Sequence, residues 1–143
     1  DFDFDKVLEK SKENPVFYVQ YAFARISSLF RSIDKDFNDE IILKPDQLKL
    51  NNNEIKILRK VFEWPKIIET ASLKYEPHRI PYYLYELSTL FHAYWSMGNE
   101  NQNYRFIKEG KIRSTGTLTI IILISIVIQR GMNILGVSLP DKM

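Results

Sequence analysis

Apolar side chains recur along much of the chain at intervals of three and four residues, which places them on one face of an α-helix. The longest such pattern lies in residues 14–33. Asn14 can cap this helix and Pro15 suits its first position, so we predict that the helix begins there and ends near residue 33. Its apolar stripe consists of Val19, Phe23, Ile26, Phe30 and Ile33.

The same spacing predicts further helices. A second one, within residues 51–64, is marked by Ile55, Leu58, Val61 and Phe62, and a third restarts at Pro65 with Ile67, Ile68 and Leu73. We expect a fourth over 82–98 with Gly98 as its C-terminal cap, and a last one over about 114–135. Between the first two, the polar segment 34–53 is expected to be a surface connection with at most one turn of helix.

No segment shows the apolar and polar alternation of a β-strand, and no internal repeat is visible. We therefore expect an all-α fold, a single bundle of about five to six helices that occupies residues 1–143 as one domain.

Residues 118–128, LTIIILISIVI, form the most hydrophobic run of the chain. A membrane span needs about 20 apolar residues, whereas this run has 11. We interpret it as a buried central helix and expect no contact with a membrane. The first ten residues, DFDFDKVLEK, are acidic and lack the basic start and apolar centre of a signal peptide.

Composition narrows the possible chemistry. The chain of 143 residues is 45% apolar with a net charge of +2, which is too close to neutral to indicate nucleic-acid binding by charge alone. It has no cysteine, two histidines and five glycines, and we find no catalytic triad, phosphate-binding glycine loop or set of metal ligands. We expect neither catalytic residues nor a metal or cofactor site in this chain, and its own status as an enzyme stays open.

The first predicted helix carries a second stripe beside its apolar one. Tyr18, Tyr21 and Arg25 follow the spacing i, i+3, i+7 and fall within about 60° of one another. This stripe is either the amphipathic edge of the core or a stacking platform for unpaired nucleic-acid bases, with a cation for phosphate or for stacking. Periodicity leaves both interpretations open.

Three separated motifs carry a resemblance to one family. NPVFYVQYAFARISSLFR (14–31) resembles the helix that opens the C-terminal anticodon-binding domain of arginyl-tRNA synthetases, which typically shows Tyr-x-Gln-Tyr-Ala-His-x-Arg. YYLYELSTLFHAYW (82–95) is similar to the Tyr-Leu-Tyr-x-Leu helix of that family and its Phe-His pair. GMNILGVSLPDKM (131–143) is similar to the family's Gly-(Leu/Met)-x-(Leu/Ile)-Leu-Gly stretch and terminal methionine.

The resemblance implies the anticodon-binding domain fold of a class I synthetase, in a C-terminal fragment of a larger protein. The parent would be an arginine–tRNA ligase that attaches arginine to tRNA-Arg with ATP and magnesium, and this fragment would contain neither its catalytic motifs nor its cofactors. The implied partners are the anticodon loop of tRNA-Arg and the parent's catalytic domain. We expect a cytoplasmic monomer.

The same resemblance implies which residues meet the anticodon loop. Tyr18, Tyr21 and Arg25 match the family helix that faces the loop, Trp95 stands where the family usually has tyrosine, and Met143 matches the terminal methionine. Two other positions of the matched motifs are expected to be structural: Phe23 on the core arc and His92 as a buried, hydrogen-bonded side chain. Gln20 is turned away from the stripe, and we expect it to serve a structural role or an inter-domain contact.

Five further basic residues could meet phosphates or could simply be solvated: Arg79, Arg105, Lys108, Lys111 and Arg113. An alternative function also stays open at this point. The aromatic fourth helix and the apolar C-terminal segment could form the interface of a helical protein-interaction module that does not bind RNA.

Overall fold

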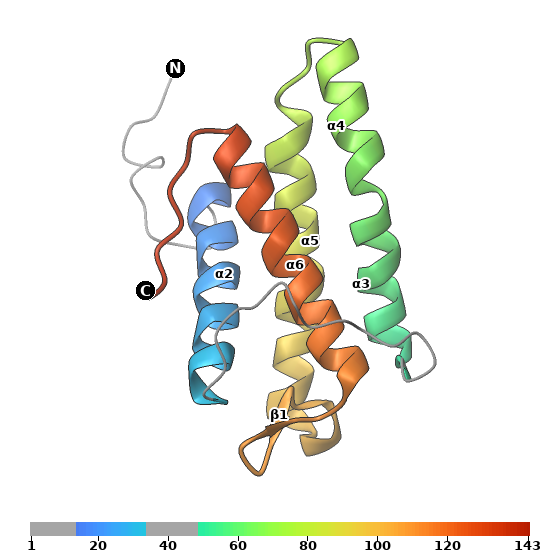
Figure 1. The fold of residues 1–143 in the computed structure, drawn as a ribbon, viewed down its shortest axis with the longest axis vertical. Coiled ribbons are helices and arrows are strands. Elements are labelled where there is room, and N and C mark those ends of the chain that lie inside the picture. The colour runs from blue at the N-terminus through green and yellow to red at the C-terminus, as the bar shows by residue number, and fades with distance from the viewer. Residues whose placement is uncertain (1–13, 34–48) are drawn as a thin grey trace.

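A computed structural model of the chain describes residues 14–33 and 49–143. Within these ranges the fold is a mostly helical bundle in which α5 contacts every other long helix, while α6 crosses it between α2 on one side and α3 with α4 on the other (Figure 1). The predicted helical bundle is confirmed in this form. The elements are α2 (Pro15–Ser32), α3 (Asn52–Phe62), α4 (Trp64–Leu73), α5 (Arg79–Glu100), η2 (Gln102–Tyr104), β1 (Ile107–Lys108), β2 (Lys111–Ile112) and α6 (Thr115–Ile134).

The expected all-α fold is confirmed only as a mostly helical one, because β1 and β2 pair as an antiparallel hairpin between α5 and α6. Its turn needs two residues at positive φ, which Glu109 (52°) and Gly110 (71°) supply. Strands of two residues are too short to show an alternating pattern in a sequence.

The number of five to six helices stays a prediction. Only Glu63 separates α3 from α4, so the two can be counted as one helix or as two. Most of the predicted connection, including the turn of helix expected there, falls in 34–48 and lies outside the described residues.

Side-chain caps start α2, α3 and α6. Asn14 caps α2 by accepting a hydrogen bond from Val16 N at 3.1 Å, as its sequence position indicated. Asn51 and Glu54 form a reciprocal capping box at the start of α3. Ser114 caps α6 by accepting from Thr117 N at 3.1 Å.

Gly98 does not end the fourth helix as predicted. Helix α5 continues to Glu100, and Gly98 lies buried within its last turns. A Cβ atom at this position would lie 3.2 Å from the Cα of Arg105. The glycine therefore allows the chain that leaves α5 to fold back closely against the helix.

Two of the apolar residues that mark α3 and α4 in the sequence do not lie in the core, although Leu58, Ile67 and Ile68 pack against it. Phe62 is 72% exposed and Leu73 is 74% exposed. On α3 the residues that point inward are Ile57, Val61 and the charged Glu54. A search for apolar spacing alone cannot anticipate that a carboxylate belongs to the buried face.

Helix α6 is buried, as predicted from its hydrophobic run, although α5 is the helix that contacts every other long one. Its length and composition would allow it to cross a membrane, but 67% of its most apolar window is buried inside the fold. Such a helix, apolar on nearly all sides, is typical of the interior of a protein. Side chains with no exposed surface are found along its whole middle: Ile120, Ile121, Ile124 and Ile128.

A polar network lies at the end of the bundle where α3 and α6 begin, and Glu54 is its centre. The Oε1 atom of this carboxylate, whose residue is 1% exposed, accepts hydrogen bonds from Arg113 Nη2 at 2.5 Å, Thr117 Oγ1 at 2.7 Å and Tyr94 Oη at 3.0 Å. Arg113 also donates to Tyr94 Oη and, through Nη1, to Asn103 O. The network thus joins α3, α5, α6 and the segment between the last two helices.

This network answers one question left by the sequence. Arg113 had two expected roles, a phosphate contact or a solvated side chain, and the structure shows neither. Its guanidinium is bound to Glu54 and Tyr94 inside the fold. Burial raises the pKa of the Tyr94 hydroxyl above its usual value, while Asn51 and Arg113 oppose that rise.

Replacing Arg113 by methionine should lower the free energy of unfolding by about 3–5 kcal/mol, because it leaves the buried Glu54 carboxylate without its cation. Urea denaturation followed by circular dichroism measures this loss. Arg130→Met is the matched control, since Arg130 is exposed on α6 and should change stability by less than about 0.5 kcal/mol. Equal, small losses in both variants would contradict a structural role for the network.

Candidate functional site

Four of the five residues predicted to form a site lie together where α2 packs against α5. The side chains of Tyr18 and Tyr21 reach from α2 to the His92 ring of α5. Their ring centroids lie 4.5 and 5.6 Å, respectively, from the centroid of the His92 ring. The guanidinium carbon of Arg25 lies 4.3 Å from the ring centroid of Tyr21 and 5.1 Å from that of Trp95. The second stripe of α2 is therefore completed by a side chain from α5.

Two further aromatic side chains extend this arrangement. Phe17 stacks on Tyr21 with ring centroids 6.3 Å apart, and Tyr85 packs on Tyr18 at 5.1 Å. Sequence reasoning missed both, although Tyr85 precedes His92 by seven residues and so shares its side of α5. We call the assembled surface the aromatic face; it consists of Phe17, Tyr18, Tyr21, Arg25, Tyr85, His92 and Trp95.

The aromatic face is partly open to solvent. Tyr21 is 36% exposed and Tyr85 is 37% exposed, while Tyr18, Arg25 and Trp95 are half-buried. Each of these side chains is held by neighbours and yet keeps accessible surface. This combination suits a platform on which planar groups stack, since little ordering remains to be done when a ligand arrives.

His92 is the buried residue that supports the aromatic face, through contacts with Arg25 and Tyr18. Its Nδ1 lies 3.1 Å from Arg25 Nη1, and its Nε2 lies 3.3 Å from the carbonyl oxygen of Tyr18. Because a guanidinium only donates and a carbonyl only accepts, Nδ1 must accept and Nε2–H must donate. His92 is therefore neutral, with its proton on Nε2. Both ring nitrogens are satisfied, which agrees with the structural role predicted for this residue.

The surroundings of His92 keep it neutral. Burial lowers its pKa to about 4, and the positive charge of Arg25 acts in the same direction, against the hydrogen bond to Tyr18 O. The residue is 7% exposed. At neutral pH the unprotonated Nδ1 of His92 thus accepts a hydrogen bond from Arg25.

Arg25 is fixed at three points. Besides its contact with His92, it donates from Nη2 to Tyr21 Oη at 2.9 Å, and its plane lies near the Trp95 ring. A held guanidinium can stack on a planar group and donate hydrogen bonds in a fixed direction. The arrangement can therefore bind a planar group that carries acceptors, or a phosphate.

A groove continues the aromatic face beyond Trp95. Its volume is about 180 Å³, below the roughly 300–1,000 Å³ of pockets for drug-sized ligands, so it suits one small planar group at most. At its rim Arg105 is fixed through its Nε, which donates to Gly98 O at 3.1 Å. The groove is lined by Leu29, Trp95, Gly98, Asn99, Arg105, Phe106 and Ile107.

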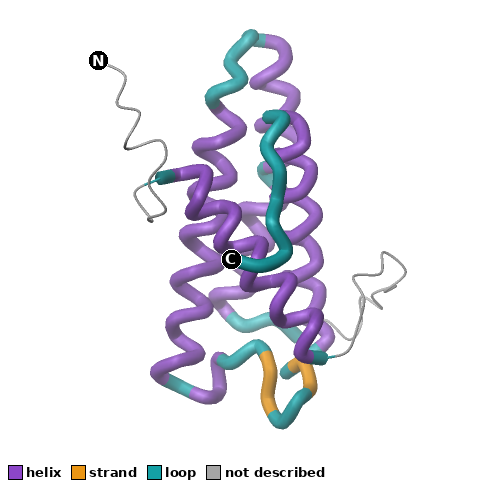
Figure 2. Tube along the Cα trace, turned by 90° about the vertical axis from the view of Figure 1, so that its left-hand side faces the viewer, coloured by secondary structure: helices purple, strands orange, loops and turns teal. Residues whose placement is uncertain are grey.

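Met143, the fifth predicted residue, lies apart from these contacts. The segment after α6 returns along α2 (Figures 1 and 2), where Gln20 Nε2 donates to Ser138 O at 2.9 Å and Arg31 Nη1 donates to Asp141 O at 3.0 Å. Helical periodicity puts Gln20 about 100° around α2 from Tyr21. Met143 is 50% exposed at the end of this segment, on another side of α2. Of the two roles expected for Gln20, this contact within the chain supports the structural one.

The remaining basic residues divide into two groups. Arg79 pairs with Glu76 at 2.5 Å and Arg105 is bonded to the backbone, so both are engaged within the fold. Lys108 and Lys111 lie exposed on the β1–β2 hairpin.

Comparison with known proteins gives concordant results. The sequence model of the DALR anticodon binding domain matches residues 19–143. The chain is 54% identical over 143 residues to an arginine–tRNA ligase of Pelagibacter ubique and 45% identical over 148 residues to one of Ruegeria pomeroyi. All of this chain is covered in both cases, but it spans only 25% and 26% of those proteins, about a quarter of their length.

A solved structure has the same fold. A crystal structure assigned to an arginyl-tRNA synthetase of Campylobacter jejuni superposes with a TM-score of 0.78 and 26% sequence identity. The match covers 99% of this chain and 29% of that one.

Stability should depend on pH through His92. As pH falls from about 6.5 to about 4, the unfolded chain binds a proton at this position before the folded one does, so the free energy of unfolding decreases by up to about 3 kcal/mol. Urea denaturation across this range measures the change. His92→Asn keeps an acceptor for Arg25 but does not titrate, so its stability should vary less with pH; the same dependence in both proteins would contradict a buried neutral histidine.

Proposed function

This chain belongs to the DALR anticodon-binding domain family, and from this premise we propose that it binds the anticodon loop of tRNA-Arg as part of an arginine–tRNA ligase. The ligase would attach arginine to tRNA-Arg with ATP and magnesium during protein biosynthesis. Because the chain spans about a quarter of its relatives' length, we place that chemistry and both cofactors in a catalytic part outside these 143 residues.

The observation that carries the proposal is the position of Arg25 between Tyr21 and Trp95. Unpaired bases stack on aromatic side chains for about 1–3 kcal/mol each, and single-stranded loops are where proteins read RNA sequence. The aromatic face offers several such rings around one fixed guanidinium. It therefore suits a short single-stranded segment better than a duplex.

The genetic code predicts which base matters most. Every arginine codon has G in the middle, so every arginine tRNA has C as its middle anticodon base. The Watson–Crick edge of cytosine presents two acceptors, O2 and N3, to which the guanidinium of Arg25 can donate. Guanine presents an N–H donor at its centre instead. We propose that this cytosine stacks on Tyr18 or Tyr21 and is read by Arg25.

Trp95 and Met143 complete the proposed set of contacts. Trp95 closes one end of the aromatic face and would stack on a neighbouring base. Met143 would approach the loop from a different side than the aromatic face does, because it ends the segment that is bound to α2. We further propose that the catalytic part of the ligase is the second partner, and that the protein is monomeric and cytoplasmic.

The alternative, a protein-interaction module without RNA binding, has less support. Much of the aromatic surface of α5 that it would use lies inside the bundle, since Tyr83, Phe91 and Tyr94 are at most 2% exposed. The family to which the chain belongs also favours RNA.

An NMR titration of the labelled chain with an arginine anticodon stem-loop tests the proposal. We expect shifts at the amides and side chains of Tyr18, Tyr21, Arg25 and Trp95, and weaker ones when the middle C of the loop is changed to G. Equal responses to the two loops would contradict reading of the cytosine. No response to either loop at millimolar concentration would contradict RNA binding by this chain.

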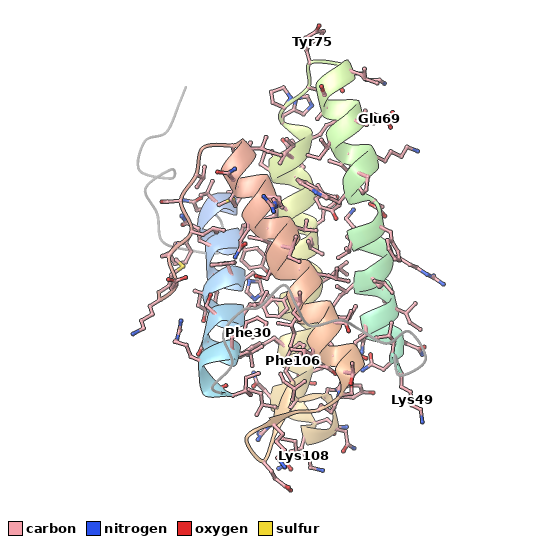
Figure 3. The ribbon with its side chains drawn as sticks, viewed as in Figure 1. Phe30, Lys49, Glu69, Tyr75, Phe106 and Lys108 are labelled. Carbon is pink, nitrogen blue, oxygen red and sulfur yellow. The ribbon has the colours of Figure 1, made fainter. Side chains whose placement is uncertain are left out.

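Replacing Tyr21 by alanine should weaken binding of the stem-loop by about 1–3 kcal/mol, the value of one base–aromatic contact. Fluorescence anisotropy gives the dissociation constant. Tyr75→Ala is the matched control, because Tyr75 is 92% exposed in the turn between α4 and α5, at one end of the molecule (Figure 3), and is not part of the aromatic face. Unchanged affinity in a folded Tyr21→Ala protein would exclude Tyr21 as the stacking residue.

A further inference from the structure

The β1–β2 hairpin adjoins the aromatic face. Phe106, which immediately precedes β1, contacts Trp95 with ring centroids 5.7 Å apart. Ile107 of β1 lines the same groove as Trp95. A strand of nucleic acid that passes Tyr21 and Trp95 therefore meets the hairpin next.

Two lysines share the outer side of this hairpin. Lys108 and Lys111 are direct cross-strand partners, and such partners project to the same face of a sheet. Both are exposed, whereas Ile107 and Ile112 are half-buried against the bundle. The lysines thus face solvent, and Lys108 lies at the end of the molecule (Figure 3).

The two ammonium groups repel each other in this arrangement. Like charges directly opposite in an antiparallel pair are destabilising. Among the described residues, the ion pairs within 4.0 Å involve Lys60, Arg79 and Arg113 but neither hairpin lysine. Glu109 in the turn supplies one negative charge, so residues 107–112 retain a net charge of +1. An anion placed between the lysines would relieve the repulsion.

The fold fixes the position of the hairpin. Arg113 N donates to Phe106 O at 2.9 Å where the strands leave the bundle, and the Arg113 side chain is anchored on Glu54. The turn itself is narrow because Glu109 and Gly110 both adopt positive φ. The lysines are consequently held on a positioned arm and not on a long loop.

We propose that the β1–β2 hairpin is a backbone-binding arm, in which Lys108 and Lys111 contact phosphodiester groups of the RNA next to the nucleotide at Trp95. This inference rests on the proposed function and adds to it a contact that carries no sequence information. Phosphate contacts set register and orientation, while bases are read elsewhere. The aromatic face would then read the loop and the hairpin would hold its backbone.

The salt dependence of binding tests the arm. Each phosphate contact contributes about 0.7–0.9 to the slope of log K against log salt concentration. We expect the double variant Lys108→Gln with Lys111→Gln to bind the stem-loop with a slope shallower by about 1.4–1.8, and to keep its preference for C over G at the middle position. Fluorescence anisotropy across a potassium chloride series measures both quantities.

Two controls make the result specific. Lys66→Gln with Lys74→Gln removes the same charge from exposed positions of α4 and the turn after it, and should leave the slope unchanged. Lys108→Arg with Lys111→Arg keeps both charges and should restore the wild-type slope. Circular dichroism confirms that each variant is folded.

The outcomes separate this inference from the proposed function. Binding by the wild type with an unaltered slope in the Lys108 and Lys111 double variant would overturn the arm while leaving anticodon binding in place. An equal loss of slope in the α4 control would also overturn it, since the effect would then follow net charge alone. Absence of binding by the wild type would overturn both.

Discussion

The buried ion pair between Glu54 and Arg113 is the constraint on which the rest of the structure depends. A charge pair in the interior repays the loss of hydration only when its other hydrogen-bonding positions are filled. Here Tyr94 and Thr117 fill them, so one carboxylate fixes the start of α3, the middle of α5 and the start of α6. Asn51 joins the same network through Tyr94 Oη, at 2.7 Å. Purely apolar packing would hold these elements together but would specify their register less sharply.

Helix α5 connects the Glu54 network to the aromatic face, because it carries residues of both. Within one turn and a half its side chains serve three purposes: Phe91 lies in the core, His92 supports Tyr18 and Arg25, and Tyr94 belongs to the Glu54 network. Trp95 follows at the groove. Because these side chains leave one rigid helix, the rotation that places Tyr94 in the network also places His92 beneath α2. The candidate site is thus positioned by a buried interaction on the far side of the helix.

The sequence predicts the parts of this design that depend on local spacing. The start of α2 at Asn14, the buried α6 and the stripe of Tyr18, Tyr21 and Arg25 all follow from periodicity and capping. It does not predict features that exist only after α5 packs: the tautomer of His92 and the partly buried ion pair of Arg113 with Glu54. The burial of Glu54 on α3 has the same origin, since a glutamate counts as a surface residue until its partners are known. The segment that bears Met143 likewise takes its course from contacts made across the fold.

Arg113 and Arg25 are both held by several contacts, but their charges serve different purposes. Arg113 faces a carboxylate, so its charge is neutralised inside the protein and serves stability. Arg25 is held as firmly, but by His92 Nδ1, Tyr21 Oη and aromatic rings, all of which are neutral. These neutral contacts therefore fix the guanidinium of Arg25 without neutralising its charge. The low pKa of His92 keeps the His92 ring uncharged at neutral pH. A carboxylate in place of His92 would pair with Arg25 and would neutralise the charge that the proposed RNA ligand needs. For this reason a domain with a net charge of only +2 can still present an unneutralised cation at the centre of an aromatic face.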